Sequence, residues 1–215
     1  VGTQFGSTRQ LGVVTVETDE GINGNAFLGS SRMGADHMAP GLIQFIKPKL
    51  LGQDPQDIGK IWWEMWKENR SVYTNVIGAI DICLWDINGK VAGQPIHRLL
   101  GTCKDQVPAY SSTAYHETIE AYAEEAILFK ELGWVAHKLH PHGDADTDIE
   151  ICEAVRDAVG DDMLLMLDSM WAYRYSDALR VGRAIEDMDY YWYEDPLVEE
   201  DIYNLSLIHI SEPTR

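Results

Sequence analysis

The 215-residue sequence lacks the features that mark several large classes of protein. Its apolar stretches stay shorter than the about 18 uncharged residues that a membrane span needs, and no basic start followed by an apolar run indicates a signal peptide. Positive charge is scarce, with 17 Lys and Arg against 35 Asp and Glu, whereas a protein that binds nucleic acid needs a basic surface. We therefore expect neither a membrane nor a nucleic acid as a partner.

Cysteine is scarce as well. Cys83, Cys103 and Cys152 are odd in number, lie far apart and form no CxxC pair, so a disulfide framework is not expected. This usage is typical of a reducing compartment, and we expect a cytoplasmic protein. The net charge of −18 leaves many carboxylates that suit the binding of a cation.

The first hundred residues have the pattern of a mixed α+β domain. Alternating apolar residues over Leu11–Thr18 and Ile22–Leu28 predict a hairpin. Residues 29–38 are rich in glycine and serine, which predicts a loop. Helical spacing of apolar residues then predicts three helices, over Ala39–Leu51, Asp54–Arg70 and Asn75–Ala92. Two strands followed by three helices indicate an α+β domain over residues 1–104.

From residue 105 onward, predicted strands alternate with predicted helices. The strands start near residues 107, 134, 163 and 190, so the spacings are 27, 29 and 27 residues. The helix before the last strand is expected to start at Ser176 as its N-cap. Repeats of this length are typical of parallel βα units, and four units make half of an eight-unit barrel, which needs about 250 residues. The predicted fold class is α/β, with half a barrel over residues 105–204.

The later predicted strands end in polar residues. Lys138 and His140 close the second strand on one face, because side chains alternate along a strand, while Asp168 ends the third strand and Glu194 the fourth. The carboxyl ends of barrel strands meet on one face, where active sites lie. Two carboxylates there are costly without a partner, and a hard cation such as Mg²⁺ prefers oxygen ligands. The alternative is a set of separate structural salt bridges. Arg156 is expected to form a salt bridge or to lie on a helix surface.

Five stretches resemble the mandelate racemase/muconate-lactonizing branch of the enolase superfamily. In the family's order they are residues 80–90 (IDICLWDINGK), 93–101 (GQPIHRLLG), 138–140 (KLH), 166–168 (MLD) and 192–197 (WYEDPL). The resemblance covers almost all of residues 1–204. It implies an N-terminal capping domain, over residues 1–104, on a modified TIM barrel. Charged residues on the helix of the first stretch, Asp86 and Lys90 among them, are expected to pack or pair at the domain junction.

The resemblance also implies roles for four residues. Asp168 and Glu194 would be two of three Mg²⁺ ligands, and Lys138 would contact the carboxylate of a small-molecule substrate. The residue two positions on would be the catalytic base. That residue is usually a second lysine, whereas here it is His140, and histidine side chains ordinarily titrate close to neutral pH. His142, on the following loop, is expected to be solvated or to support the site.

The reaction implied by the resemblance is abstraction of the proton α to a carboxylate, with an enediolate stabilised by Mg²⁺ and Lys138. Loss of a β-hydroxyl would then dehydrate an acid sugar, an aldonate or aldarate. Racemisation, epimerisation or cycloisomerisation of a sugar lactone would use the same intermediate. Two polar loops that would set specificity, near Gly2–Arg9 and Gly29–His37, favour a hydroxylated acid. We therefore expect an acid-sugar dehydratase, a lyase, before an isomerase, and a homo-oligomeric parent protein.

The last residues, 205–215 (LSLIHISEPTR), resemble a translated sequencing adapter. We expect them to be a non-native tail on a truncated enzyme. The third metal ligand and a base on the opposite face of the substrate would then be absent from this chain. His209 and Glu212 are not assigned these roles. The alternative for function is accordingly that the chain as written is a catalytically incomplete fragment.

Overall fold

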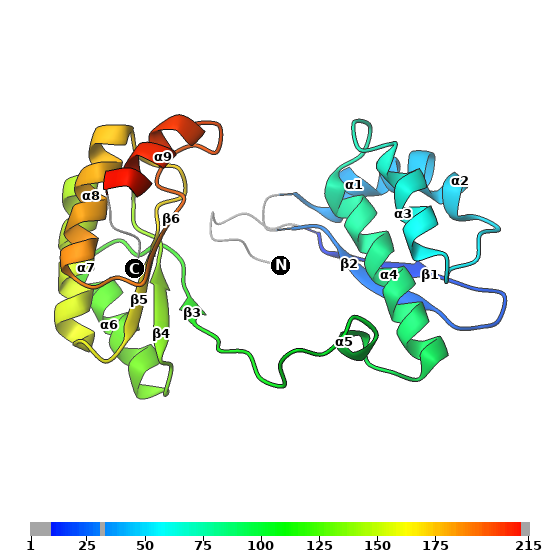
Figure 1. Cartoon of the computed structure of the whole chain (residues 1–215), viewed down its shortest axis with the longest axis horizontal. Helices are drawn as coiled ribbons and strands as arrows, with labels where there is room; N and C mark the ends of the chain where they lie inside the picture. Colours follow the sequence, from blue (N-terminus) through cyan, green and yellow to red (C-terminus); the bar gives the residue numbers. More distant parts are fainter. Residues whose placement is uncertain (1–9, 31–32, 212–215) are drawn as a thin grey trace. The chain divides into compact units, whose positions relative to one another are not determined.

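The computed structural model describes residues 10–30 and 33–211. Gly2–Arg9, the side chain of His209 and Glu212 lie outside this description, as does part of the loop near Gly29–His37. The chain divides into two compact units, one ending at Gln106 and the other starting at Val107 (Figure 1). Within the described part, no helix combines the length and the apolar character that crossing a bilayer requires.

The first unit begins with an antiparallel hairpin of β1 (Gly12–Val16) and β2 (Gly24–Leu28). Ala26 and Leu28 are buried, whereas the side chains between them are exposed, as the alternating sequence predicts. A Cβ on Gly24 would lie only 2.0 Å from the carbonyl oxygen of Cys83. Glycine is therefore required where the hairpin meets the long helix behind it.

The helices of this unit differ from the three predicted ones in number and in bounds. They are α1 (Ala35–Gly41), a π-helical segment (Leu42–Ile46), α2 (Lys47–Leu50), α3 (Ile58–Trp66), α4 (Thr74–Ala92) and α5 (Ile96–Leu99). The predicted loop over 29–38 is too long, because α1 starts at Ala35, whose amide donates to the carbonyl of Gln10 at 2.7 Å. Pro40 lacks an amide donor inside α1, and the chain widens into the π-helical segment directly after it.

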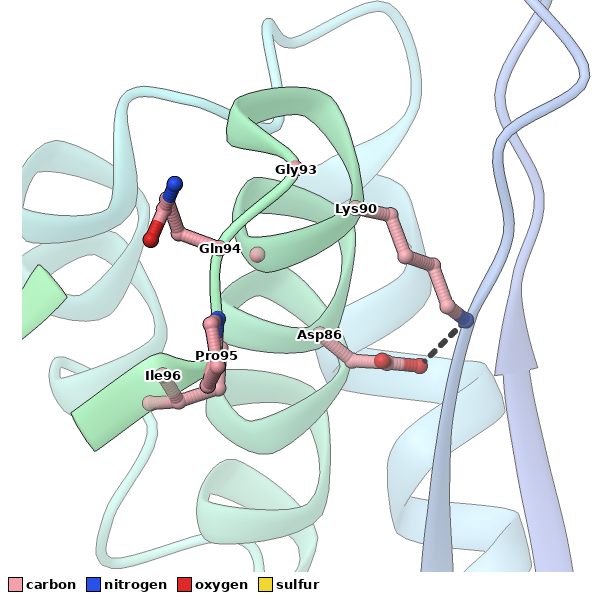
Figure 2. Close-up of a pocket in the computed structure, with 7 residues that line it drawn as sticks. Asp86, Lys90, Gly93, Gln94, Pro95 and Ile96 are labelled. Atoms are coloured by element: carbon pink, nitrogen blue, oxygen red, sulfur yellow. Dashed lines mark hydrogen bonds and ion pairs between the residues drawn. The ribbon is translucent and has the colours of Figure 1, made fainter. Parts of the chain in front are cut away.

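A shallow hollow of about 320 Å³ lies at the end of α4 (Figure 2). Two charged residues line it: Lys90 donates to Asp86 at 2.7 Å and to the carbonyl of Asn23 at 2.6 Å. Asp86 also accepts the amide of Asn25 at 2.9 Å. These contacts join α4 to the hairpin within the first unit, so the two charges hold this domain together and are already occupied by partners.

The second unit is a four-stranded parallel sheet with helices between its strands. In chain order it contains β3 (Ser111–Ser112), α6 (Ile119–Glu131), β4 (Ala136–Leu139), α7 (Ala145–Val159), β5 (Leu164–Asp168), α8 (Tyr175–Asp187), β6 (Trp192–Glu194) and α9 (Ile202–Ser211). The strand order is β3-β4-β5-β6, and α6, α7 and α8 cover one face of the sheet (Figure 1). The predicted α/β fold with four parallel βα units is confirmed.

Local signals set the ends of most of these elements. Thr118 caps α6 by accepting the amide of Ala121 at 3.3 Å. Gly133, at φ +87°, ends that helix because a left-handed residue lets the chain turn back. The prediction that Ser176 caps α8 is wrong, since α8 starts at Tyr175 and Ser176 lies in its first turn. The first predicted strand, over 107–113, shortens to Ser111–Ser112.

The helix-facing side of the sheet is the core of the second unit. Leu139, Leu165 and Leu167 are fully buried there against residues of α6, α7 and α8. Helix α9 adds Ile208, which is also buried in this core. Residues 205–211, predicted to belong to a non-native tail, are thus part of a helix, and their origin stays a prediction.

Candidate active site at the carboxyl ends of the strands

Lys138 of β4, Asp168 of β5 and Glu194 of β6 lie on the face of the sheet away from the helices. The parallel register aligns Lys138 with Met166 and Trp192, and it aligns Asp168 with Glu194. Because alternate residues point to opposite faces, these side chains and the apolar core lie on opposite faces of the sheet. The sheet therefore delivers charged groups to one surface while it buries leucines on the other.

The four residues singled out in the sequence come together in space. The ammonium nitrogen of Lys138 lies 3.1 Å from Oδ2 of Asp168 and 2.8 Å from Oε2 of Glu194. Nε2 of His140 lies 3.1 Å from the same Oδ2 of Asp168. Lys138 and Asp168 are each only 7% exposed, whereas the side chain of Glu194 is 38% exposed. The cluster is thus buried on one side and open at Glu194.

The protonation of Lys138 limits what it can do. Burial acts to lower the pKa of its ammonium, but hydrogen bonds to Glu194 and Asp168 outweigh burial and raise that pKa. The ring of Tyr110, 5.7 Å from the nitrogen, also favours the charged form. Lys138 therefore stays a cation at neutral pH, suited to pairing with an anion and unsuited to removing a proton.

His140 has a free ring position. Its Nε2 contacts Asp168, while Nδ1 is buried and has no hydrogen-bond partner among the described residues. Buried polar atoms are almost always satisfied, so an orphaned ring nitrogen at a strand end indicates a partner that this part of the chain does not supply. The backbone of His140 is fixed from behind, because the hydroxyl of Tyr122 donates to its carbonyl at 2.9 Å.

The two carboxylates fit a divalent cation as a pair of ligands and not as a complete set. Both already converge on one cationic atom, and Asp168 is fixed by the amide of Met170, which donates to its other oxygen at 3.1 Å. Their oxygens are the hard donors that Mg²⁺ prefers. In residues 10–30 and 33–211, however, no three His, Cys, Asp or Glu side chains gather in a way that could hold a metal.

The sequence pattern missed several residues around this cluster. Tyr110 reaches it from before β3 and packs edge-on against Trp192, with ring centroids 5.2 Å apart. Only the tertiary fold brings these two rings together, so no local signal could have found them.

His142 is exposed, and its ring stacks on Tyr115 at 6.0 Å between centroids. Arg156 lies on helix α7, one of its two expected placements, and its contacts in the described part of the chain are to backbone carbonyls, with no salt bridge among them.

Two family models match the chain. The model of the mandelate racemase/muconate lactonizing enzyme N-terminal domain matches residues 2–101, and the enolase C-terminal domain-like model matches residues 120–214. Together they cover both units of the structure.

The three cysteines of the chain are free thiols, as the sequence predicts.

Individual relatives agree with these models. L-talarate/galactarate dehydratase of Salmonella typhimurium is 31% identical over 88% of this chain and 50% of its own. D-galactarolactone cycloisomerase of Agrobacterium fabrum is 29% identical over 94% of this chain and 55% of its own. The crystal structure of D-glucarate dehydratase from Agrobacterium tumefaciens, complexed with magnesium, has a TM-score of 0.82 and 29% identity over 92% of this chain and 55% of its own. The chain spans about half the length of the curated relatives it matches. It belongs to the mandelate racemase/muconate lactonizing enzyme family of the enolase superfamily.

Proposed function

We propose that this chain carries the proton-abstracting site of a Mg²⁺-dependent acid-sugar dehydratase. One observation carries the proposal: Lys138, His140 and two carboxylates meet within 3.1 Å at the ends of three neighbouring strands. A cation, a base and metal-binding oxygens are the groups that removal of a proton next to a carboxylate requires. The relatives named as sugar-acid dehydratases support this reading of the site.

Each residue has a distinct role in the proposed reaction. Asp168 and Glu194 would hold Mg²⁺, which would supply positive charge beside the substrate carboxylate. The ammonium of Lys138 pairs with the substrate carboxylate. The imidazole of His140 accepts the proton from the α carbon, and the C–O bond of the β-hydroxyl then breaks. The hydroxyl leaves as water by taking up a proton from the imidazolium of His140 or from solvent, and the enol that remains tautomerises to the keto-deoxy acid. The partner is a small sugar acid, and the free thiols support a reducing, cytoplasmic location.

Two other outcomes use the same residues. A racemase, epimerase or cycloisomerase would form the same enediolate without losing water, and a cycloisomerase stands among the relatives. The chain alone can also be catalytically incomplete, because its described carboxylates offer two metal ligands and not three. Dehydration is preferred because sugar-acid dehydratases recur among the relatives.

A panel of aldonates and aldarates, incubated with the chain and Mg²⁺, separates these outcomes. Dehydration gives a keto-deoxy acid, which is detected by NMR, and His140→Gln abolishes it while the matched variant His142→Gln leaves it. Isomerisation without a keto product would replace the dehydratase proposal by the isomerase. A folded chain that binds Mg²⁺ but forms no product would identify an incomplete fragment. A folded chain that does neither would contradict the proposal.

A further inference from the structure

The loop that follows His140 is held by a buried carboxylate. Asp148, in the first turns of α7, is fully buried, and it accepts the amide of His142 at 3.1 Å and that of Gly143 at 2.9 Å. It also accepts the hydroxyl of Tyr173. Burial raises the pKa of Asp148, and these three donors act against that rise. Burying a carboxylate costs free energy because it loses its hydration. The three donors around Asp148 offset that cost.

Tyr173 lies in a different loop, the one that follows Asp168. Its hydrogen bond to Asp148 therefore joins the loop of His140 to the loop of the proposed metal ligand. The same two loops also touch at Gly143, which has φ +91° and where a Cβ would lie 2.6 Å from the Cβ of Ala172. Glycine permits both the backbone angle and the close approach.

The joint extends to the loop that follows Glu194. The amide of Trp171 donates to the carbonyl of Asp195 at 2.7 Å, and that of Tyr173 donates to the carbonyl of Pro196 at 3.2 Å. Trp171 and Asp195 both have positive φ, as does Met170. Such angles in residues other than glycine persist only where the surroundings enforce them. The loops after β4 and β5 are thus joined through the side chains of Tyr173 and Asp148, and the loops after β5 and β6 through backbone hydrogen bonds.

We infer that Asp148 and Tyr173 are positioning residues that keep His140 in register with the two carboxylates. Asp148 holds the backbone amides of His142 and Gly143, and Tyr173 ties Asp148 to the loop after β5. The role of Asp148 and Tyr173 in catalysis rests on the proposed function, whereas the coupling of the loops does not.

Amide hydrogen exchange of the 215-residue chain tests the coupling without any assumption about activity. Tyr173→Phe removes one hydroxyl and leaves Asp148 with its two backbone donors. We expect exchange at the amides of residues 171 and 173, and at those of His142 and Gly143 in the other loop, to rise about tenfold or more while the strand amides stay unchanged. Tyr190→Phe is the matched control, because the hydroxyl of Tyr190 donates to the carbonyl of Cys152 at 3.0 Å, outside these loops. Exchange rates unchanged by Tyr173→Phe would overturn the inference.

A second perturbation guards against a variant that does not fold. Gly143→Ala pushes against Ala172 and strains the same joint without altering the charge of Asp148. It is expected to raise exchange at His142 and at the amides of the loop after β5. Faster exchange confined to residues 142–143 would show that the loops are not coupled.

Measurements of kcat and KM distinguish a positioning role of Tyr173 from a role in stability alone. With a sugar-acid substrate in hand, Tyr173→Phe is expected to lower kcat by about 10- to 100-fold while KM changes by less than about twofold. Tyr190→Phe should change neither. Faster exchange with unchanged kcat would contradict the positioning role. A wild-type chain without turnover would count against the proposed function, and the exchange result would still decide whether the loops are coupled.

Discussion

The two ends of the four-stranded sheet use charged side chains in opposite ways. At the amino ends, the guanidinium of Arg156 donates only to neutral acceptors in the contacts the structure gives it, namely the carbonyls of Gly160, Met163, Met188 and Asp189. At the carboxyl ends, Lys138 meets two carboxylates, and a ring nitrogen of His140 is buried without a partner in the described part of the chain.

The difference indicates that the amino ends of the strands serve stability and that the carboxyl ends carry the candidate active site. Arg156 satisfies carbonyls that the ends of α7 and α8 leave open, so its environment is complete within the fold. The cluster at the other end has a buried ring nitrogen with no partner among the described residues, so its environment lacks a hydrogen-bond partner that this part of the chain does not supply. Barrel enzymes as a class keep stability at the amino face and chemistry at the carboxyl face.

The largest expected effect is at the carboxyl end. Asp168→Asn removes one of two proposed metal ligands and a partner of both Lys138 and His140, and should reduce turnover by about 10²–10³-fold. Calorimetric titration should show weaker Mg²⁺ binding. Asp162→Asn, an exposed aspartate before the same strand, is the matched control. Equal Mg²⁺ affinity in the two variants would break the distinction between the ends.

The amino end should respond in stability alone. Arg156→Met leaves several carbonyls without a donor and should lower the free energy of unfolding of the second unit by about 3–4 kcal/mol. Arg180→Met, which removes an exposed arginine paired with Asp146 and Asp177, should leave that free energy of unfolding almost unchanged. Chemical denaturation measures both. A loss of Mg²⁺ binding in folded Arg156→Met would contradict the division of roles.

His137, the neighbour of Lys138 in β4, extends the comparison to the helix-facing side of the sheet. Burial lowers the pKa of His137 to about 4. Its unfolded form takes up a proton near pH 6.5, so the stability contributed by the neutral form is complete above that pH and is lost as pH falls toward 4. The loss should be about 2–3 kcal/mol.

Denaturation at pH 7 and pH 4.5 measures this effect. His137→Gln, which cannot titrate, should flatten the difference. His97→Gln, at an exposed histidine of the first unit, should leave it in place. An equally steep dependence in His137→Gln would assign the acid sensitivity to other groups.

The smallest effect tests the helix caps. Thr118→Ala removes the side chain that accepts the amide of Ala121 and should cost about 1 kcal/mol. Ser176→Ala should cost almost nothing, because Ser176 lies inside α8 and caps no amide in the contacts given for this helix. Thermal denaturation of the two variants compares them directly, and the reverse ranking would favour the sequence prediction over the structure.

Much of the architecture could be predicted because it depends on local periodicity. The hairpin, the four parallel strands and the convergence of Lys138, His140, Asp168 and Glu194 all follow from side-chain alternation and from the rule that barrel strands end on one face. These four residues lie at or next to the ends of predicted strands, where a short chain segment determines which way each points.

What could not be predicted depends on contacts between distant segments. Asp148 has the sequence context of an ordinary acidic residue near a helix start, and only the fold brings Tyr173 to it. Arg156 is an ordinary helix-surface residue until the chain places two later loops around its guanidinium. Tyr110 belongs to no regular element, yet its ring, directly before the edge strand β3, packs against Trp192 of the opposite edge strand β6.

The central claim is that the cluster at the carboxyl ends removes a proton next to a carboxylate. The most direct measurement is NMR of sugar acids incubated with the chain and Mg²⁺ in ²H₂O, with His140→Gln and His142→Gln in parallel. The account predicts deuterium at the α carbon or loss of that proton into a keto-deoxy product, abolished by EDTA and by His140→Gln and retained in His142→Gln. Exchange that persists in His140→Gln at the wild-type rate would contradict it.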